Sequence, residues 1–193
     1  MLQTIKAKLI GKAPLLMHNG QLADPLNPFA IALAASVKSS SKKTGAGIAE
    51  TRKYEWFGSL YLDEAGHVCI PADMVLAMAI MGAKKSKQGM NAKSGVYTNK
   101  SSFKLEYKGP KDPNKLYEDP RFVDCRGAKV PSGGRVMRTR PVFREWAVEI
   151  EMVIDTEVID TNEVCIALDK AGQLIGLGDF RPRFGRFEVE HLS

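Results

Sequence analysis

Alternating apolar and polar residues predict several β-strands, and these strands are concentrated in the last third of the chain. Residues 146–154 alternate apolar with charged or polar side chains through most of their length, which is typical of a half-buried strand. Residues 2–10 follow a similar pattern, with Leu, Ile and Ala near one face. Strands are expected over 2–10, 103–107, 122–130, 136–143, 146–154 and 187–190, with a hairpin over 58–70 around a turn at 63–66.

Helices are predicted where apolar residues cluster and capping or turn residues mark the ends. Pro28 follows the capping residue Asn27 and opens an alanine-rich helix. Pro71 opens a second helix, which is dense in Met, Leu and Ile and should be buried. Thr161 is expected to cap the last helix. The helices expected are 29–37, 49–56, 72–83 and 161–175.

Two segments lack this periodicity. Residues 84–100 contain many Lys, Ser and Asn residues, so we expect a mobile loop or an arm there. Residues 109–120 hold three prolines and are expected to form a loop. The chain is therefore expected to be one domain, 1–193, with flexible basic insertions at about 38–53 and 84–115.

A strand, a helix, a Gly-rich loop and a final strand follow one another near the C-terminus, and this order is half of a ferredoxin-like unit. We therefore predict an α+β fold with a ferredoxin-like (RRM-like) core. The chain has 193 residues, enough for one domain to bury a core of its own. Its three cysteines are widely spread, which favours neither a disulfide framework nor a zinc site. No apolar run approaches a membrane span, and the N-terminal strand lacks the features of a signal peptide, so a cytoplasmic protein is expected.

The net charge of +6 conceals an uneven distribution along the sequence. Residues 84–115 hold nine lysines and two acids, and residues 121–144 hold six arginines, one lysine and one acid. Residues 145–180 hold nine acids and one lysine. Blocks of opposite sign indicate separate faces, and a basic face indicates either a polyanionic partner or simple solvation.

The segment 176–186 combines three glycines, three arginines and two phenylalanines. Glycine lets a backbone approach a partner closely, arginine binds phosphate with a planar fork, and phenylalanine offers a stacking surface. This combination suits single-stranded nucleic acid, although a tight turn whose phenylalanines fill the core would use the same residues. The candidate binding residues are Gly176, Gly178, Phe180, Arg181, Arg183, Phe184 and Arg186.

A second candidate is the strand predicted over 136–143. On one parity it places Arg138, Arg140 and Arg144, about 7 Å apart per two-residue step, which suits a row of phosphates. The alternative is a solvated face paired with the acidic residues 145–163. Lysines in the two basic insertions could clamp a nucleic-acid backbone or could belong to ordinary surface loops: Lys42, Lys43, Lys84, Lys85, Lys87 and Lys93.

Catalysis has little support in the sequence. The three histidines have no metal-ligand spacing, so neither a metal nor a cofactor is expected. The weak candidates are His18, which could act as a general base in RNA cleavage, and Asp24, which lies in a loop between two prolines. An ordinary turn histidine and a loop aspartate are the simpler interpretations.

The C-terminal helix, the Gly-rich loop with Gly176, Gly178 and Gly185, and the opening strand followed by residues 14–18 resemble the repeat-associated RNA-binding superfamily of CRISPR systems. The resemblance is to its Cas7-like backbone subunits, and the chain could be a reduced or phage-borne relative. It implies a subunit of an antiviral effector that assembles as a helical or ring oligomer along guide RNA, with other effector subunits as possible partners.

The expected function is therefore non-catalytic binding of single-stranded nucleic acid, RNA in preference, by subunits that assemble side by side. Two alternatives stay open. One is a metal-independent endoribonuclease of the same superfamily with His18 as its base. The other is a structural assembly protein, viral for example, whose basic and acidic blocks pair between subunits.

Overall fold

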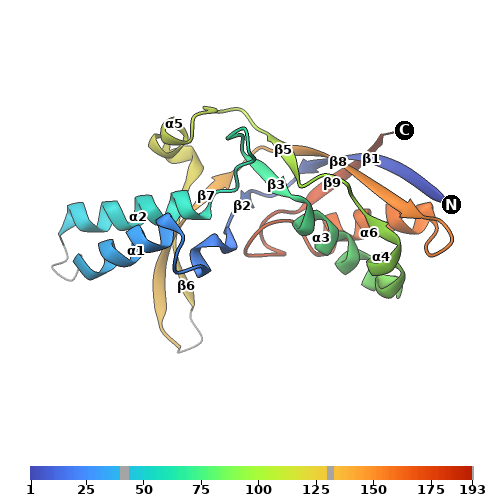
Figure 1. Cartoon of the computed structure of the whole chain (residues 1–193), viewed down its shortest axis with the longest axis horizontal. Coiled ribbons are helices and arrows are strands. Elements are labelled where there is room, and N and C mark those ends of the chain that lie inside the picture. Colours follow the sequence, from blue (N-terminus) through green and yellow to red (C-terminus); the bar gives the residue numbers. More distant parts are fainter. Residues whose placement is uncertain (40–43, 130–132, 193) are drawn as a thin grey trace. The chain divides into compact units, whose positions relative to one another are not determined.

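The computed structural model describes residues 1–39, 44–129 and 133–192, and it shows a mixed α+β chain with antiparallel sheets. The α+β class expected from the sequence is therefore confirmed. The chain forms two compact units (Figure 1). Unit 1 comprises Met1–Leu15, Leu62–Lys108 and Arg144–Ser193, and unit 2 comprises Leu16–Tyr61 and Gly109–Phe143. That both units belong to one domain stays a prediction.

Unit 1 is built on an antiparallel sheet with the strand order β3-β5-β8-β1-β9. These strands are β1 (Leu2–Gly11), β3 (Cys69–Pro71), β5 (Ser102–Glu106), β8 (Ala147–Asp155) and β9 (Phe187–Leu192), and the short β4 (Val96–Tyr97) also pairs with β8. The alternation that predicted β8 is realised, because its apolar positions Val148, Ile150, Met152 and Ile154 are all buried.

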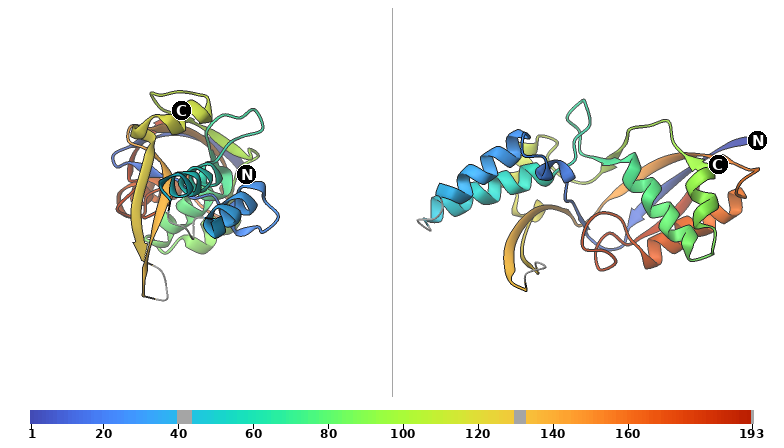
Figure 2. Two further views of the ribbon diagram at one scale, coloured as in Figure 1. Left: turned by 90° about the vertical axis from the view of Figure 1, so that its left-hand side faces the viewer. Right: turned by 60° about the horizontal axis from the view of Figure 1, so that its bottom comes forward.

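Helices cover one face of this sheet: α3 (Ala72–Lys84), α4 (Gly89–Gly95) and α6 (Thr161–Leu174) (Figures 1 and 2). Helices α3 and α6 pack closely at Gly82, where a Cβ would overlap the carbonyl oxygen of Ala167. The apolar residues of α3 face this contact, with Val75, Met78 and Ala79 buried. The burial predicted for this helix is thus confirmed on one face, while Met81 stays partly exposed.

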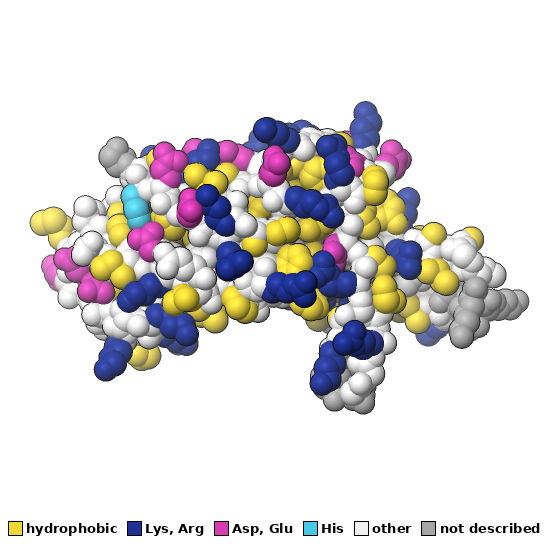
Figure 3. Space-filling model, turned by 180° about the vertical axis from the view of Figure 1, so that it is seen from behind, with side chains coloured by type: hydrophobic (Ala, Val, Ile, Leu, Met, Phe, Trp, Pro, Cys, Tyr) yellow, Lys and Arg dark blue, Asp and Glu magenta, His cyan; other side chains and the backbone are white. Residues whose placement is uncertain are grey.

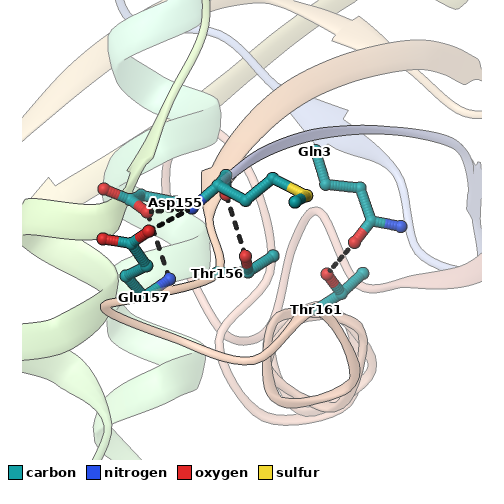
Figure 4. A network of polar contacts seen from close by, with 6 residues as sticks. Gln3, Asp155, Thr156, Glu157 and Thr161 are labelled. Carbon is teal, nitrogen blue, oxygen red and sulfur yellow. Dashed lines mark hydrogen bonds and ion pairs between the residues drawn. The ribbon is translucent and has the colours of Figure 1, made fainter.

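The start of α6 corrects the capping residue expected from the sequence. Asp160 is the N-cap, and its side chain accepts a hydrogen bond from the Asn162 N–H at 2.7 Å. The Thr161 hydroxyl instead donates to the Gln3 side chain at 2.7 Å, in a network that ties the start of β1 to the turn after β8 (Figure 4). In the same network the Thr156 hydroxyl donates to the Met1 carbonyl at 2.8 Å.

Unit 2 contains a helical hairpin and a small antiparallel sheet. The helices α1 (Pro28–Ser39) and α2 (Gly45–Ser59) lie side by side (Figure 2). The strands β6 (Val123–Lys129) and β7 (Arg135–Phe143) form a two-stranded ribbon, and β7 also pairs with β2 (Leu15–Leu16). Short helical turns complete the unit: η1 (Gly20–Ala23), α5 (Pro113–Glu118) and η3 (Pro120–Phe122). Its core is centred on Trp56, which is fully buried and donates to the Phe122 carbonyl at 3.0 Å.

The structure differs from the sequence prediction in three segments, two expected loops and one expected hairpin. The predicted loop over 84–100 contains α4 and β4, because small and apolar residues among its lysines, such as Ala92 and Val96, are buried. The loop expected over 109–120 contains α5, which Asp112 caps by accepting from the Asn114 N–H. The hairpin expected over 58–70 is confirmed around its turn, where Leu62 and Val68 form an antiparallel bridge, but α2 extends to Ser59 and β3 pairs with β5.

Among the residues that the structure describes, no helix combines the length and the apolar character needed to cross a bilayer.

Candidate nucleic-acid interface

The loop between α6 and β9, residues 176–186, is called here the arginine loop, and its own hydrogen bonds fix its backbone. Gly176, Gly178 and Gly185 all have positive φ, which side chains other than glycine rarely adopt. The Leu177 N–H donates to the Gly185 carbonyl at 2.8 Å, and the Gly185 N–H donates to the Pro14 carbonyl at 2.8 Å. A Cβ at Gly185 would overlap the Leu177 oxygen. The close approach expected of the glycines is therefore used, at Gly185, to close the loop on itself.

The two phenylalanines of the arginine loop have different environments. Phe184 is 7% exposed and belongs to the core of unit 1, as the tight-turn interpretation requires. Phe180 is 37% exposed and has a φ of 55°, an uncommon value for a residue with a side chain. The rings meet edge to face with centroids 6.4 Å apart. Phe184 thus anchors the loop, and Phe180 keeps exposed ring surface beside it.

Phe180 lines an open pocket of about 510 Å³ at one end of α3. The pocket is also lined by Met81, Leu174, Arg181 and Pro182. Arg181 is exposed, and its Nη1 lies 3.9 Å from the Met81 sulfur. Phe180, Met81 and Leu174 are large apolar residues with exposed surface, so the pocket combines apolar walls with a guanidinium group. Such a combination can hold a flat, partly polar group.

Four of the predicted lysines lie at the end of α3, in the turn after it and on α4, and none of them lines this pocket. Lys84 is the last residue of α3, three residues after Met81, and its side chain passes close to Gly89, while Lys85 caps the helix. Both lysines are exposed. Lys87, in the turn after α3, and Lys93, on α4, are exposed as well. Lys42 and Lys43 lie outside the described residues.

The remaining arginines of the loop, Arg183 and Arg186, are exposed and form no ion pair with any residue of the described ranges. The Arg186 carbonyl accepts from the N–H groups of Lys12 and Ala13, at 2.8 and 3.1 Å. The backbone at Arg186 is therefore held while its side chain remains exposed.

The second candidate, the ribbon of β6 and β7, differs from the expected row of guanidinium groups, and that expectation was wrong in two respects. First, Arg140 is only 7% exposed. Second, β7 ends at Phe143, and Arg144 lies outside the strand and in unit 1. The physical reason is that the second half of β7, from Thr139 to Phe143, is buried on both faces. The ribbon belongs to the sheet β2-β7-β6, whereas the arginine loop leads into β9 of the other sheet.

Two arginines of the ribbon form ion pairs with acidic residues. The Glu55 carboxylate, 6% exposed, accepts from Arg138 Nη1 at 2.8 Å and from the Thr139 N–H at 2.8 Å. Arg126 pairs with Asp124 on the same strand, which raises the pKa of the guanidinium. Figure 3 shows basic side chains along the ribbon next to the residues drawn in grey.

As an alternative, the predicted row of arginines was expected to pair with the acidic residues 145–163. The acids of β8 in this range pair with lysines instead. Glu149 and Glu151 pair with lysines of unit 1 itself: Lys8 lies 3.6 Å from Glu149, and Lys6 lies 3.6 Å from Glu151. A hydrogen bond with Glu106 raises the pKa of Lys8. Much of the charge on this face of the sheet is thus balanced within the unit.

The two weak catalytic candidates lie in different settings. His18 is exposed and lines a cavity of unit 2 together with Arg138 and Arg140. Asp24 does not line that cavity, and its Oδ1 accepts from the Leu26 N–H at 2.9 Å, as a turn aspartate commonly does. Within residues 1–39, 44–129 and 133–192, no three His, Cys, Asp or Glu side chains gather as a metal site would require.

Sequence reasoning missed three residues of these sites. Met81 was assigned to the core, although its spacing from Lys84 and Lys85 could have placed it on their face. Glu55 and Lys129 line the cavity of unit 2 and gave no signal, because a single charge in a helix or strand is ordinarily solvated.

None of the known protein-family models matches this chain. No curated protein shows a significant match to it.

Proposed function

We propose that this protein binds single-stranded nucleic acid, RNA in preference to DNA, without cleaving it, and that copies assemble side by side along the strand. The observation that carries the proposal is the exposed ring of Phe180 beside Arg181, on a loop whose backbone is fixed by glycines and internal hydrogen bonds. A base can stack on Phe180, while Arg181, Arg183 and Arg186 bind phosphates.

The rigidity of the arginine loop strengthens this proposal. Binding is weakened when a flexible segment must be ordered, and a loop already closed by its own hydrogen bonds avoids most of that cost. Lys84 and Lys85, three and four residues after Met81, add exposed cations to unit 1, and lysine attracts a phosphate backbone without regard to sequence. The strand is therefore expected along the pocket and the loop.

We also propose that unit 1 is a ferredoxin-like core of the Cas7-like kind, and that the protein is a cytoplasmic effector subunit. The order along the chain supports the core: β1, α3, β5, β8, α6 and β9 alternate as two strand–helix–strand halves. In the sheet these strands are arranged β5-β8-β1-β9, with each neighbouring pair antiparallel. The relationship to CRISPR proteins rests on this order and on the Gly-rich loop before the last strand.

The sheet itself is a less suitable platform for RNA. RRM domains stack bases on aromatic residues of the sheet, but here the charged positions of β1 and β8 form cross-strand Lys–Glu pairs. Figure 3, which draws one face of the molecule, shows acidic and basic side chains intermixed on that face. These pairs also reduce the support for a structural protein assembled by charge pairing between subunits, because they are satisfied within one chain.

The proposal is tested by fluorescence anisotropy with a labelled single-stranded RNA and the matching DNA, over a series of salt concentrations. Arg181→Ala combined with Arg183→Ala should weaken binding by about tenfold or more and lower the salt dependence by about two released ions. Strands of increasing length should carry increasing numbers of copies in analytical ultracentrifugation.

The matched control is Lys6→Ala combined with Lys100→Ala. It removes two cations from the same unit, both of which face Glu151 across the sheet at 3.6 and 4.0 Å. The control should bind RNA nearly as tightly as the unaltered protein. Binding that does not respond to salt, or an equal loss in both double variants, would contradict the proposal.

A second candidate function is RNA cleavage with His18 as general base. It is favoured by one observation, that His18 lines the same cavity as Arg138 and Arg140, where a phosphate could be held beside an imidazole. Labelled RNA incubated with the protein and with His18→Ala decides the matter. Products that disappear in the variant support cleavage, and absence of products from the unaltered protein excludes it.

A further inference from the structure

The two units of the chain differ in net charge. Unit 2 contains 13 Lys and Arg residues and 7 Asp and Glu residues, a net charge of +6, whereas unit 1 contains 15 of each kind and is neutral. The net charge counts both partners of every ion pair, so pairing within a unit does not change it. Long-range attraction for a polyanion is therefore expected from unit 2.

One surface of unit 2 combines cations with aromatic rings. It consists of Arg52, Lys53 and Phe57 on α2 and Tyr117 on α5, and it is called here the α2–α5 surface. The Phe57 and Tyr117 ring centroids are 5.6 Å apart, and Lys53 Nζ lies 6.0 Å from the Phe57 centroid. Burial raises the pKa of Tyr117, and the charge of Arg52 acts against this rise, so Arg52 lies within electrostatic range of the phenol. Both cations thus lie beside the paired rings.

Both cations of the α2–α5 surface are exposed, and both rings are partly exposed. Neither Arg52 nor Lys53 forms an ion pair with a residue of the described ranges. The buried acid of the same helix, Glu55, binds Arg138 on the ribbon instead. The two cations therefore face solvent next to exposed ring surface.

The core of unit 2 fixes the two rings. Trp56 is fully buried and contacts both of them, with centroids 5.1 Å from Phe57 and 5.3 Å from Tyr117. Its Nε1 donates to the Phe122 carbonyl at 3.0 Å, which ties α2 to η3. A ligand that stacks on this surface would meet rings that are already in place, so little order would have to be imposed on them.

We infer that the α2–α5 surface is a second contact for single-stranded nucleic acid. A base stacks on the exposed ring surface of Phe57 and Tyr117, and Arg52 and Lys53 bind the neighbouring phosphates. Unpaired bases suit this surface better than a duplex, whose bases are already stacked on one another. The inference rests on the proposed function for its ligand, but it does not depend on the arginine loop, which belongs to unit 1.

Fluorescence anisotropy with a labelled single-stranded RNA tests the inference on the full chain. Arg52→Ala combined with Lys53→Ala should weaken binding by about tenfold, because two charged contacts are lost. The slope of log affinity against log salt should fall by about 1.4, the value for two phosphate contacts on a single strand. Both residues are exposed, so the variant should keep its fold.

The matched control is Lys38→Ala combined with Arg135→Ala. It removes the same charge from the same unit at two exposed positions on other elements, α1 and β7. The control should weaken binding by less than about twofold, because only long-range attraction is lost. An equal loss in the two double variants would overturn the inference, since net charge alone would then explain the binding.

Photocrosslinking of a strand that contains bromouridine tests the stacking without any substitution. Mass spectrometry should find crosslinks at Phe57 or Tyr117, because a stacked base lies directly against the ring. Absence of crosslinks from both residues would overturn the inference. So would displacement of the strand by polyglutamate of equal charge at equal concentration, which would show a site for acidic protein instead.

The double variant at Arg181 and Arg183 separates this inference from the proposed site on the arginine loop. If that variant binds RNA normally while Arg52→Ala with Lys53→Ala does not, the arginine loop is not the binding site and the α2–α5 surface is. If only the variant at Arg181 and Arg183 loses affinity, the inference is overturned and the proposed function stands.

Discussion

The arginine loop of unit 1 and the ribbon of unit 2 are both rich in arginine but differ in how their cations are used. Arg181, Arg183 and Arg186 are exposed, and none of them forms an ion pair with a described residue. On the ribbon, Arg126 pairs with Asp124, and Arg138 pairs with Glu55. The loop therefore presents its cations toward solvent, whereas the ribbon uses several of its cations to hold its own structure and to line a cavity.

This difference shows why a count of arginines is a poor guide to a binding surface. In the loop, glycine conformations, backbone hydrogen bonds and the buried Phe184 supply the structure, so the arginine side chains stay exposed. In the ribbon, the buried Glu55 carboxylate organises Arg138 and the backbone of Thr139. The part of an arginine-rich segment that is available to a partner depends on what else holds the segment together.

Gly185→Ala gives the largest expected effect on the loop. The residue has a φ of 71°, and a Cβ would overlap the Leu177 oxygen, so alanine should cost about 4 kcal/mol or more in the free energy of unfolding. Gly66→Ala is the matched control, since Gly66 has a φ of 78° and nothing within 4 Å of a Cβ. It should cost about 1 kcal/mol. Urea unfolding measures both, and equal losses would show that backbone closure of the loop is unimportant.

Phe184→Ala and Phe180→Ala should separate the structural and binding roles inside the loop. Removing the buried Phe184 ring should lower the free energy of unfolding by about 3 kcal/mol. Phe180→Ala should change it by less than about 1 kcal/mol and should weaken single-stranded RNA by about tenfold, because a stacked base is lost. Urea unfolding and anisotropy, run on both variants, check this division. A Phe180→Ala protein with full RNA affinity would place the strand elsewhere.

Glu55→Ala tests the ribbon side of the comparison. It leaves the Thr139 N–H and the Arg138 guanidinium without their carboxylate, which should cost about 2 kcal/mol in unit 2. Glu50→Ala, an exposed position on the same helix α2, should cost less than about 0.5 kcal/mol. Thermal or urea unfolding compares the two. If they behave alike, the ribbon does not depend on its buried acid.

Much of the fold was accessible from the sequence because it rests on local patterns. The alternation in β8, the Asn27 cap before Pro28 and the glycines after α6 all act over a few residues. Their elements were therefore predicted nearly in place. The arrangement of α4 was missed because the burial of Ala92 depends on packing against α3 and is hidden among lysines.

The candidate sites were less predictable, since they depend on contacts between distant parts of the chain. Arg181 meets Met81 across 100 residues of sequence, and Arg138 meets Glu55 across 83. Arg138 and Arg140 are two residues apart on β7, so strand periodicity puts them on one face, and both line the same cavity. Periodicity does not reveal what covers that face. The burial of Arg140 follows from the packing of β7, which no local pattern expresses.

Lys8→Met should have a small effect on unit 1. Lys8 pairs with Glu106 at 2.8 Å and with Glu149 at 3.6 Å, but exposed pairs contribute only a few tenths of a kcal/mol. The difference from the unaltered protein should shrink further at high salt. Urea unfolding at two salt concentrations checks this. A loss above about 1 kcal/mol would mean that the charged face of the sheet, rather than its core, stabilises unit 1.

The smallest expected effect concerns the acid-dependent stability of unit 2, next to its ribbon. Hydrogen bonds from Arg121 hold the pKa of Asp119 below its usual value, with the guanidinium Nη2 at 2.6 Å from Oδ2. A carboxyl whose pKa is lower in the folded state stabilises that state above its unfolded pKa of about 3.9, and this contribution disappears as the pH falls through the folded pKa. Urea unfolding between about pH 2 and 6 should therefore show a slightly steeper acid loss than in Asp119→Asn. Arg121→Ala should reduce the slope in the same way, because the Asp119 pKa returns toward its usual value. Identical pH profiles for all three proteins would show that the Asp119–Arg121 pair, unlike Glu55 with Arg138, contributes nothing to the free energy of unfolding.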